Sequence, residues 1–335
     1  MYYKASVHEI IDYLTFSGRT LLTEQGLCVD WSGAGLELLC MAERVIIGFD
    51  EYAYDQPCYI KVCIDGKPHS SYAISTGKEK VLLTLSDDFH RISIFRITEG
   101  NIPLIIKGFE FYGSEIGVRE LRQKQKIRLE FIGDSLTCGY GILGSRHSEG
   151  FKTYEEDVTA GFSWLAAAEL EANARYIAIS GQGIVKNCNG EIDTPIPLFY
   201  TWQTRSGREP ADTSWIPDII IISAGTNDHS GGVSKDEFRR GAEDFTAQLR
   251  SLHPAADIVW DYGTANDYYC ETLQAMVAEL SENDSRIHYL KMPQMNYTNE
   301  LGTNGHPNAR YAKRAVETLL PLLREIKDSR DNENI

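Results

Sequence analysis

The stretch Phe-Ile-Gly-Asp-Ser-Leu-Thr-Cys-Gly-Tyr-Gly at residues 131–141 decides the fold of the larger part of this chain. It ends an apolar run of β character, residues 127–132, and delivers Ser135 onto a turn bounded by glycines. Turns at the carboxyl ends of parallel strands are where α/β enzymes place reacting groups. Gly-Asp-Ser is also an ordinary turn composition, so Ser135 is a nucleophile candidate that needs partners elsewhere.

Downstream of this stretch, β-rich runs alternate with helical ones, which predicts a parallel sheet of crossover units. Further strands are expected at 175–180, 219–223, 258–261 and 287–290. Helices are expected at 161–172, 235–252, 269–280 and 308–326, the last with a kink at Pro321. Ser234 and Glu237 resemble a capping box for the second helix, which His253 and Pro254 should end.

Upstream, short β-rich runs recur at the spacing of a sandwich, and no amphipathic helix interrupts them. They are expected at 36–40, 44–49, 59–64, 80–85, 91–97 and 102–111, with a hairpin turn at Asp65 and Gly66. This part predicts an all-β, jelly-roll-like sandwich. A polar, basic stretch separates the two patterns, so we expect a sandwich domain at 1–115, a linker at 116–126 and an α/β domain at 127–335.

Composition narrows the classes of partner. With 48 acidic and 33 basic residues, the net charge of -15 disfavours nucleic acid and anionic membranes. The first 16 residues mix charged and apolar side chains, so we expect a cytoplasmic protein, or a secreted one if a leader precedes this sequence. The 7 cysteines lack CxxC spacing, which favours reduced thiols over structural zinc. We expect no metal or organic cofactor.

The turns after the first three predicted strands should gather at one edge of the sheet. They are the turn of Ser135, Ser-Gly-Gln-Gly at 180–183 and Gly-Thr-Asn-Asp at 225–228, and His306 lies in the loop before the last helix. Acyl transfer needs a hydroxyl, a base and donors aimed at the developing oxyanion. Ser135, His306, the Gly181 amide and the Asn227 side chain supply all of these.

These blocks resemble those of the SGNH (GDSL) hydrolases, which contribute Ser, Gly, Asn and His in this chain order. Within that superfamily the chain is most similar to carbohydrate esterase family 2, whose members place a β-sandwich before the hydrolase domain and carry a block much like residues 133–141. The acidic stretch 155–157 is also similar. The resemblance implies a three-layer, flavodoxin-like hydrolase domain. It further implies an acetyl xylan esterase-type enzyme that removes acetyl groups from plant-type carbohydrates such as xylan and glucomannan.

Carried over to this sequence, the resemblance implies that Ser135 attacks an ester carbonyl while His306 acts first as base and then as acid. The amides of Ser135 and Gly181 and the side chain of Asn227 would form the oxyanion hole. Asp134 and Asp228 are expected to bond amides of their own loops.

One position departs from the superfamily pattern, in which an Asp commonly lies three residues before the His. Thr303 stands there in this chain. Family 2 esterases are known to hold the imidazole with a backbone carbonyl, so we predict that the carbonyl of Thr303 or Asn304 orients His306. A carboxylate from elsewhere is the alternative, and Glu300 is the nearest in sequence.

Substrate contacts are predicted for Trp202, which lies in the aromatic loop at residues 199–202, and for Gln182 and Asn187, which follow the second block. Burial is the alternative for Trp202, since most Trp side chains are buried. His229 is a rival base that we expect at the rim of the site.

Two alternative functions stay open at this point. One is a broader esterase, thioesterase or acyltransferase acting on lipid-like substrates. The other is a non-catalytic carbohydrate-binding protein in which the sandwich makes the contacts. The sequence leaves the sugar, the deacetylated hydroxyl and the oligomeric state open.

Overall fold

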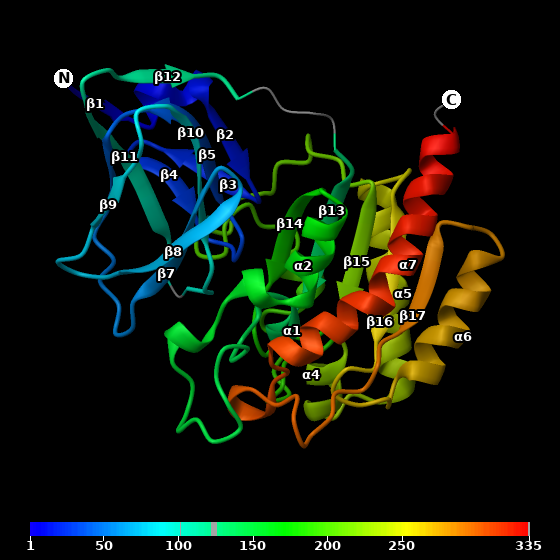
Figure 1. Cartoon of the computed structure of the whole chain (residues 1–335). Coiled ribbons are helices and arrows are strands. Elements are labelled where there is room, and N and C mark those ends of the chain that lie inside the picture. Colours follow the sequence, from blue (N-terminus) through cyan, green and yellow to red (C-terminus); the bar gives the residue numbers. More distant parts are fainter. Residues whose placement is uncertain (101, 122–125, 334–335) are drawn as a thin grey trace. The chain divides into compact units, whose positions relative to one another are not determined.

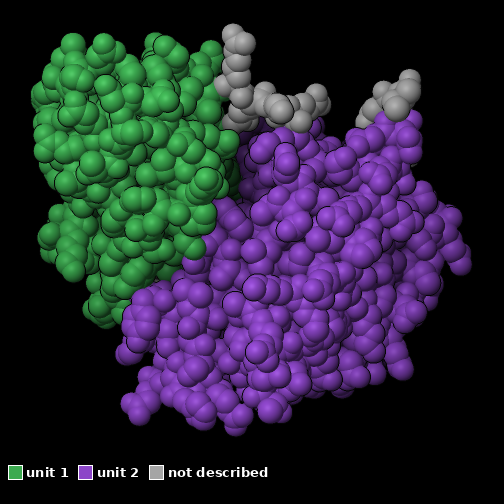
Figure 2. All heavy atoms as spheres, in the orientation of Figure 1, with its two compact units in different colours: residues 1–125, 203–210 green, residues 126–202, 211–335 purple. Residues whose placement is uncertain are grey.

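The computed structural model describes residues 1–100, 102–121 and 126–333. The chain forms two compact units, coloured separately in Figure 2: residues 1–125 with 203–210, and residues 126–202 with 211–335. Residues 203–210 thus join the first unit, although the sequence pattern assigns them to the second domain. Of the linker expected at 116–126, residues 122–125 lie outside the described residues, and Gly117–Arg119 forms a strand of the first unit.

Within the described residues, the first unit contains two six-stranded antiparallel sheets (Figure 1). The first has the order β3 (Thr20–Thr23), β4 (Gly26–Val29), β11 (Leu104–Tyr112), β6 (Arg44–Phe49) and β9 (Lys80–Thr84), and β1 (Tyr2–Ser6) also pairs with β11. The second has the order β12 (Gly117–Arg119), β5 (Gly35–Met41), β10 (Phe89–Arg96), β7 (Cys58–Ile64) and β8 (Lys67–Ile74), and β2 (Leu14–Ser17) also pairs with β5. A 3-10 helix at His8–Tyr13 joins β1 to β2.

Alternation of buried and exposed side chains explains the sandwich. In β6, the buried Val45, Ile47 and Phe49 alternate with more exposed neighbours, so one face of the strand is apolar. Asp65 and Gly66 adopt φ angles of 53° and 77°, which makes the predicted hairpin turn between β7 and β8 a type I′ turn. The all-β prediction is confirmed. The edge strand β8 was not predicted because its first residues are polar and exposed, so no apolar alternation marks it.

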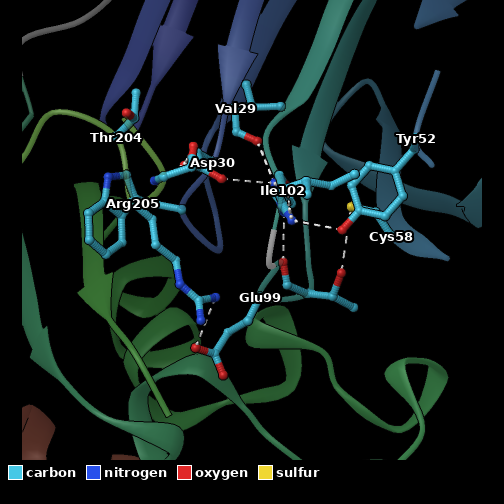
Figure 3. A network of polar contacts seen from close by, with 12 residues as sticks. Val29, Asp30, Tyr52, Cys58, Glu99, Ile102, Thr204 and Arg205 are labelled. Atoms are coloured by element: carbon cyan, nitrogen blue, oxygen red, sulfur yellow. Dashed lines mark hydrogen bonds and ion pairs between the residues drawn. The ribbon is translucent and has the colours of Figure 1, made fainter. Parts of the chain in front are cut away.

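Residues 203–210 join the first unit through a buried charged residue of the sandwich (Figure 3). The Asp30 carboxylate accepts the amide and the hydroxyl of Ser206 through one oxygen, each at 2.7 Å. Its other oxygen lies 3.4 Å from a guanidinium nitrogen of Arg96, whose side chain is fully buried. The indole of Trp31 donates to the Gln203 carbonyl at 2.9 Å. These partners are remote in sequence, so the local pattern of the segment does not reveal them.

The second unit is built on a five-stranded parallel sheet within the described residues. Its order is β14 (Asn173–Ala178), β13 (Arg128–Gly133), β15 (Ile219–Ser223), β16 (Asp257–Tyr262) and β17 (Ile287–Lys291). The helices are α1 (Ser135–Cys138), α2 (Phe162–Glu169), α3 (Ile196–Phe199), α4 (Thr226–Ser230), α5 (Lys235–Leu252), α6 (Cys270–Ser281) and α7 (Ala309–Glu333). Short 3-10 helices lie at Thr153–Glu155, Val158–Ala160 and Thr303–Gly305.

The layers follow from burial. Every residue of β15 and β16 is buried, which requires helices on both faces of the sheet. Helix α2 packs beside α7, and α5 packs beside α6. Helix α5 begins at the capping box that Ser234 and Glu237 form, as predicted. Helix α7 continues through Pro321 beyond the predicted end at residue 326, since buried Leu319 and Leu323 extend its apolar face past the proline.

The strand order reverses between β13 and β15, because the chain first adds β14 on one side of β13 and then β15 to β17 on the other. This is the flavodoxin-like order, and ligands of such sheets bind outside the carboxyl ends of the strands at the reversal. Ser135 follows β13 and Asn227 follows β15 at that place. None of the described helices is long and apolar enough to cross a membrane.

Candidate active site

Asp134 positions Ser135 at the end of β13. Its buried carboxylate caps the one-turn helix α1 by accepting the Leu136 amide at 2.9 Å, so it has the loop-bonding role expected of it. Gly139 ends the helix with φ 77°, and a Cβ there would lie 2.5 Å from the Asp157 carbonyl oxygen. Only glycine fits this close approach in the left-handed region. Ser135 is 7 % exposed.

Ser135 and His306 form a hydrogen-bonded pair. The Nε2 atom of His306 lies 2.8 Å from the Ser135 hydroxyl oxygen, and its Nδ1 atom lies 3.2 Å from the Asn304 carbonyl oxygen. Because a carbonyl can only accept, Nδ1 carries the hydrogen and Nε2 accepts the serine hydroxyl. Of the two carbonyls proposed from the sequence, the one that faces the ring is that of Asn304.

Glu300, the alternative orienter, is bound elsewhere. Its carboxylate accepts the Arg314 Nε at 2.9 Å and the Asn296 amide at 2.6 Å. The hydrogen bond from Arg314 is the main cause that lowers the pKa of Glu300. The structure therefore places Glu300 in an ion pair with α7, while a carbonyl occupies the position at His306 Nδ1.

The three predicted oxyanion donors differ in their present bonding. Gly181 adopts φ 80°, and within the described ranges its amide donates no hydrogen bond. The Ser135 amide lies in the first turn of α1, where amides lack an intrahelical acceptor. The Asn227 Nδ2 atom instead donates to the Asp134 carboxylate and the Gln182 carbonyl, both at 2.9 Å. Asn227 could serve an oxyanion only by sharing one of these hydrogens, so its role stays a prediction.

The three residues predicted to contact the substrate are buried or hydrogen-bonded within the protein. Trp202 is 7 % exposed, which fits the alternative of a buried ring. Asn187 organises its own loop, because its side-chain oxygen accepts the amides of Asn189 and Glu191. The Gln182 carbonyl holds Asn227. Contacts of Trp202, Gln182 and Asn187 with a substrate stay predictions.

His229 and Asp228, two further residues considered in the sequence analysis, both follow β15. His229 is exposed and stacks on Tyr268, with ring centroids 4.3 Å apart. Asp228 is fully buried and accepts three consecutive amides, those of residues 184–186. These amides lie in the loop after β14, so the prediction that Asp228 bonds amides of its own loop was wrong for these three bonds. Burial raises the pKa of Asp228. No group of three or more His, Cys, Asp or Glu side chains in the described part of the chain could hold a metal ion.

An aromatic pair beside His306 was missed at the sequence level. The rings of Tyr140 and Phe151 stack with centroids 3.9 Å apart and 12° between their planes, and Tyr140 also contacts the His306 ring at 4.5 Å. The Tyr140 hydroxyl accepts the Asn304 side-chain amide at 3.1 Å. The Gly-Tyr-Gly at 139–141 was the available signal for Tyr140. Phe151 lies in a polar loop with no pattern that marks it.

A cavity with mostly apolar walls adjoins the nucleophile. Its lining includes Ser135, Leu136, Ile142, Phe162 and Tyr311, and the cavity is partly open to solvent. Because these walls come from residues of the second unit, the space belongs to the same unit as the hydrogen-bonded pair.

This arrangement can perform acyl transfer. As the Ser135 oxygen attacks an ester carbonyl, its proton passes to His306 Nε2, and the amide donors stabilise the oxyanion. Collapse of the tetrahedral intermediate expels the alcohol, which takes the proton from Nε2, and leaves an acyl-serine. Water then attacks the acyl-serine while His306 takes its proton; the proton passes to the Ser135 oxygen as the acyl bond breaks, which restores the serine hydroxyl and releases the free acid.

The model of the GDSL-like Lipase/Acylhydrolase family matches residues 131–319, more than half of the chain. This protein belongs to that family. A second model, described as Carbohydrate esterase 2 N-terminal, matches residues 16–117. The family assignment agrees with the order of the four blocks and with an enzyme that hydrolyses carboxylic esters.

Known relatives extend the comparison over nearly the whole chain. An acetylxylan esterase / glucomannan deacetylase of Cellvibrio japonicus is 24% identical over 94% of this chain and 89% of its own length. The cellulase/esterase CelE of Acetivibrio thermocellus is 25% identical over 83% of this chain, which spans only 35% of CelE. The structure of the acetyl xylan esterase Est2A from Butyrivibrio proteoclasticus has a TM-score of 0.88 at 20% identity and covers 97% of this chain and 98% of its own. The predicted two-part fold is confirmed.

Proposed function

We propose that this protein removes acetyl groups from carbohydrate hydroxyls through an acyl-enzyme on Ser135. The observation that carries the proposal is the contact of 2.8 Å between the Ser135 oxygen and His306 Nε2, with Nδ1 on a main-chain carbonyl. The match of residues 16–117 to the N-terminal part of carbohydrate esterase 2, and a relative named acetylxylan esterase / glucomannan deacetylase, support a carbohydrate as the substrate.

The surroundings of the nucleophile support the acyl group and the sugar separately. The apolar cavity beside Ser135 suits a short acyl chain. The stacked rings of Tyr140 and Phe151 beside His306 suit the apolar face of a pyranose, because aromatic faces bind such surfaces. Both features belong to the second unit.

The direct experiment measures acetate released from acetylated xylo-, manno- and gluco-oligosaccharides. Ser135→Ala and His306→Ala should each lower kcat by at least about a thousandfold, since each removes a reacting group. His229→Ala should retain most of the activity, because this exposed side chain stacks on Tyr268 instead.

Three results would contradict the proposal. Equal turnover of acetate and long-chain esters would favour a broader esterase or acyltransferase. Failure of an organophosphate to label Ser135 would favour a non-catalytic binding protein. Loss of activity in His229→Ala but not in His306→Ala would reassign the base.

Localisation is a separate proposal. We expect this enzyme to act in the cytoplasm on small acetylated oligosaccharides, which cell fractionation followed by the acetate-release assay would check. Activity found only outside the cell would contradict it.

A further inference from the structure

The turn that presents the orienting carbonyl has an unusual backbone. Asn304 adopts φ 52° and ψ 35°, in the left-handed region that residues other than glycine rarely occupy. This conformation directs its carbonyl toward His306 Nδ1. A backbone in this region persists only where the surroundings hold it.

Thr303, directly before Asn304, is held on three sides. It is fully buried. Its amide donates to the Gly141 carbonyl at 3.0 Å, and its own carbonyl accepts the His306 amide at 3.1 Å. Its hydroxyl donates to the Glu155 carboxylate at 3.0 Å. The first two bonds use the main chain, so the bond to Glu155 is the one that depends on the identity of residue 303.

Glu155 is an ionised, nearly buried acceptor. It is 7 % exposed. Besides Thr303 it accepts the Ser148 hydroxyl at 2.7 Å and the Lys152 amide at 3.3 Å. Burial raises the pKa of Glu155, but the hydrogen bonds from Ser148, Thr303 and Lys152 outweigh that effect and lower it overall. Glu155 is therefore a carboxylate at neutral pH, and its bond to Thr303 is a charge-assisted one.

Two glycines of the segment after the nucleophile make room for this contact. A Cβ at Gly144 would lie 1.8 Å from the Thr303 hydroxyl oxygen and 3.0 Å from a Glu155 carboxylate oxygen. A Cβ at Gly141 would lie 2.9 Å from the Thr303 carbonyl oxygen. The turn at residues 303–306 therefore packs directly against the segment that follows Ser135.

We propose that Glu155 and Thr303 are positioning residues for His306. Position 303 holds no aspartate that could bond the ring directly, so the buried Glu155 carboxylate acts on the ring through Thr303 and the turn. The Glu155–Thr303 bond fixes the turn, the turn aims the Asn304 carbonyl, and the carbonyl fixes the tautomer and direction of the imidazole. This inference rests on the proposed function, because it assigns roles in the same reaction.

The chemistry predicts which kinetic constant depends on this bond. A misdirected imidazole binds substrate no differently but takes and returns the proton less well, so kcat should fall while KM stays unchanged. The Nδ1 hydrogen bond to the carbonyl also stabilises the imidazolium. When that bond weakens, the pKa of His306 should fall, and the acid limb of the kcat/KM profile should move to lower pH.

The test uses Thr303→Val, which keeps the shape of the side chain and removes its hydroxyl, and Thr303→Ser, which restores the hydroxyl. With p-nitrophenyl acetate, we expect Thr303→Val to lower kcat by about tenfold or more, to leave KM within about twofold and to shift the acid limb downward. Thr303→Ser should recover most of kcat. Thr159→Val is the matched control, since it removes a hydroxyl bonded to the nearby Asp157 carboxylate at 2.6 Å.

A second variant decides the matter if Thr303→Val does not fold. Glu155→Gln should lower kcat by about threefold or more at constant KM, because one amide oxygen accepts fewer and weaker hydrogen bonds than a carboxylate. Unchanged kcat in a folded Thr303→Val or in Glu155→Gln would overturn the inference, and so would a Thr303→Ser enzyme as slow as Thr303→Val. Wild-type protein that neither hydrolyses the aryl acetate nor reacts with an organophosphate would count against the proposed function instead.

Discussion

Residues 131–141 help to position both Ser135 and His306. The first part of the block caps α1 and presents Ser135, while Tyr140 and Gly141 contact the turn of His306. The sequence identified the pair through the order and spacing of its blocks. It could not choose between Thr303, Asn304 and Glu300 as orienter, because that depends on where one carbonyl points.

At the same scale, we predict that Phe151 contributes to sugar binding more than Trp202 does. Phe151→Ala should raise KM for acetylated oligosaccharides by about fivefold, the equivalent of about 1 kcal/mol for one aromatic contact, and leave KM for p-nitrophenyl acetate unchanged. Trp202→Ala should mainly lower the melting temperature, since the ring is buried. A rise in KM for oligosaccharides only in Trp202→Ala would restore the original assignment of Trp202.

At the scale of elements, strands β13 to β17 and helices α2 and α6 lie close to the predicted ranges, and α5 has the predicted bounds. Helix α7 extends beyond its predicted end, and the short helices α1, α3 and α4 were not predicted. Each predicted element has a local signal, such as the four consecutive isoleucines of β15 or the capping box of α5. Strands β1, β2, β3 and β8 lack a strong apolar alternation, so local patterning did not mark them. The short strands β4 and β12 were not predicted either.

The end of β16 carries a buried acid that should make stability depend on pH. Burial raises the pKa of Asp261 to about 7, although the Ser223 hydroxyl bonds it at 2.6 Å. Since the native value exceeds the ordinary 3.8, the native state holds more protons between these values, and stability should fall as pH rises from about 4 to 7. Asp261→Asn should remove this decline, which amounts to about 1.4 kcal/mol for each pKa unit.

Thermal unfolding of the wild type and of Asp261→Asn, measured from about pH 4.5 to about pH 8 in steps of about half a unit, would test this prediction. Asp257 at the start of the same strand is the matched control of opposite sign: although burial raises its pKa, hydrogen bonds from His288 and Arg330 lower it overall. Asp257→Asn should therefore cost stability at neutral pH and lose that effect in acid. A constant melting-temperature difference between Asp261→Asn and wild type would refute the assignment.

At the scale of the whole molecule, the chain passes from the second unit into the first and back at residues 203–210. Asp30 joins this segment to the buried Arg96 (Figure 3). We predict that Asp30→Ala lowers the free energy of unfolding by about 3 kcal/mol, because it leaves a buried guanidinium without its carboxylate. It should also speed tryptic cleavage after Arg205 and Arg208.

Limited proteolysis with mass spectrometry of the fragments would test this. Asp212→Ala is the matched control, since the exposed Asp212 makes the same pair of bonds to the amide and hydroxyl of Ser214. Equal cleavage rates after Arg205 and Arg208 in both variants would show that Asp30 does not retain the segment.

The sequence by itself determined the two-part fold, the sandwich and parallel-sheet patterns, and the four blocks of the site, because periodicity and turn chemistry are recorded in neighbouring residues. Only the tertiary structure decided that the Asn304 carbonyl faces His306, that Asn227 is bonded to Asp134, and that residues 203–210 belong to the first unit. Glu155 and Thr303 are 148 positions apart, and no local pattern records a hydrogen bond between side chains that meet only when the sheet brings their loops together.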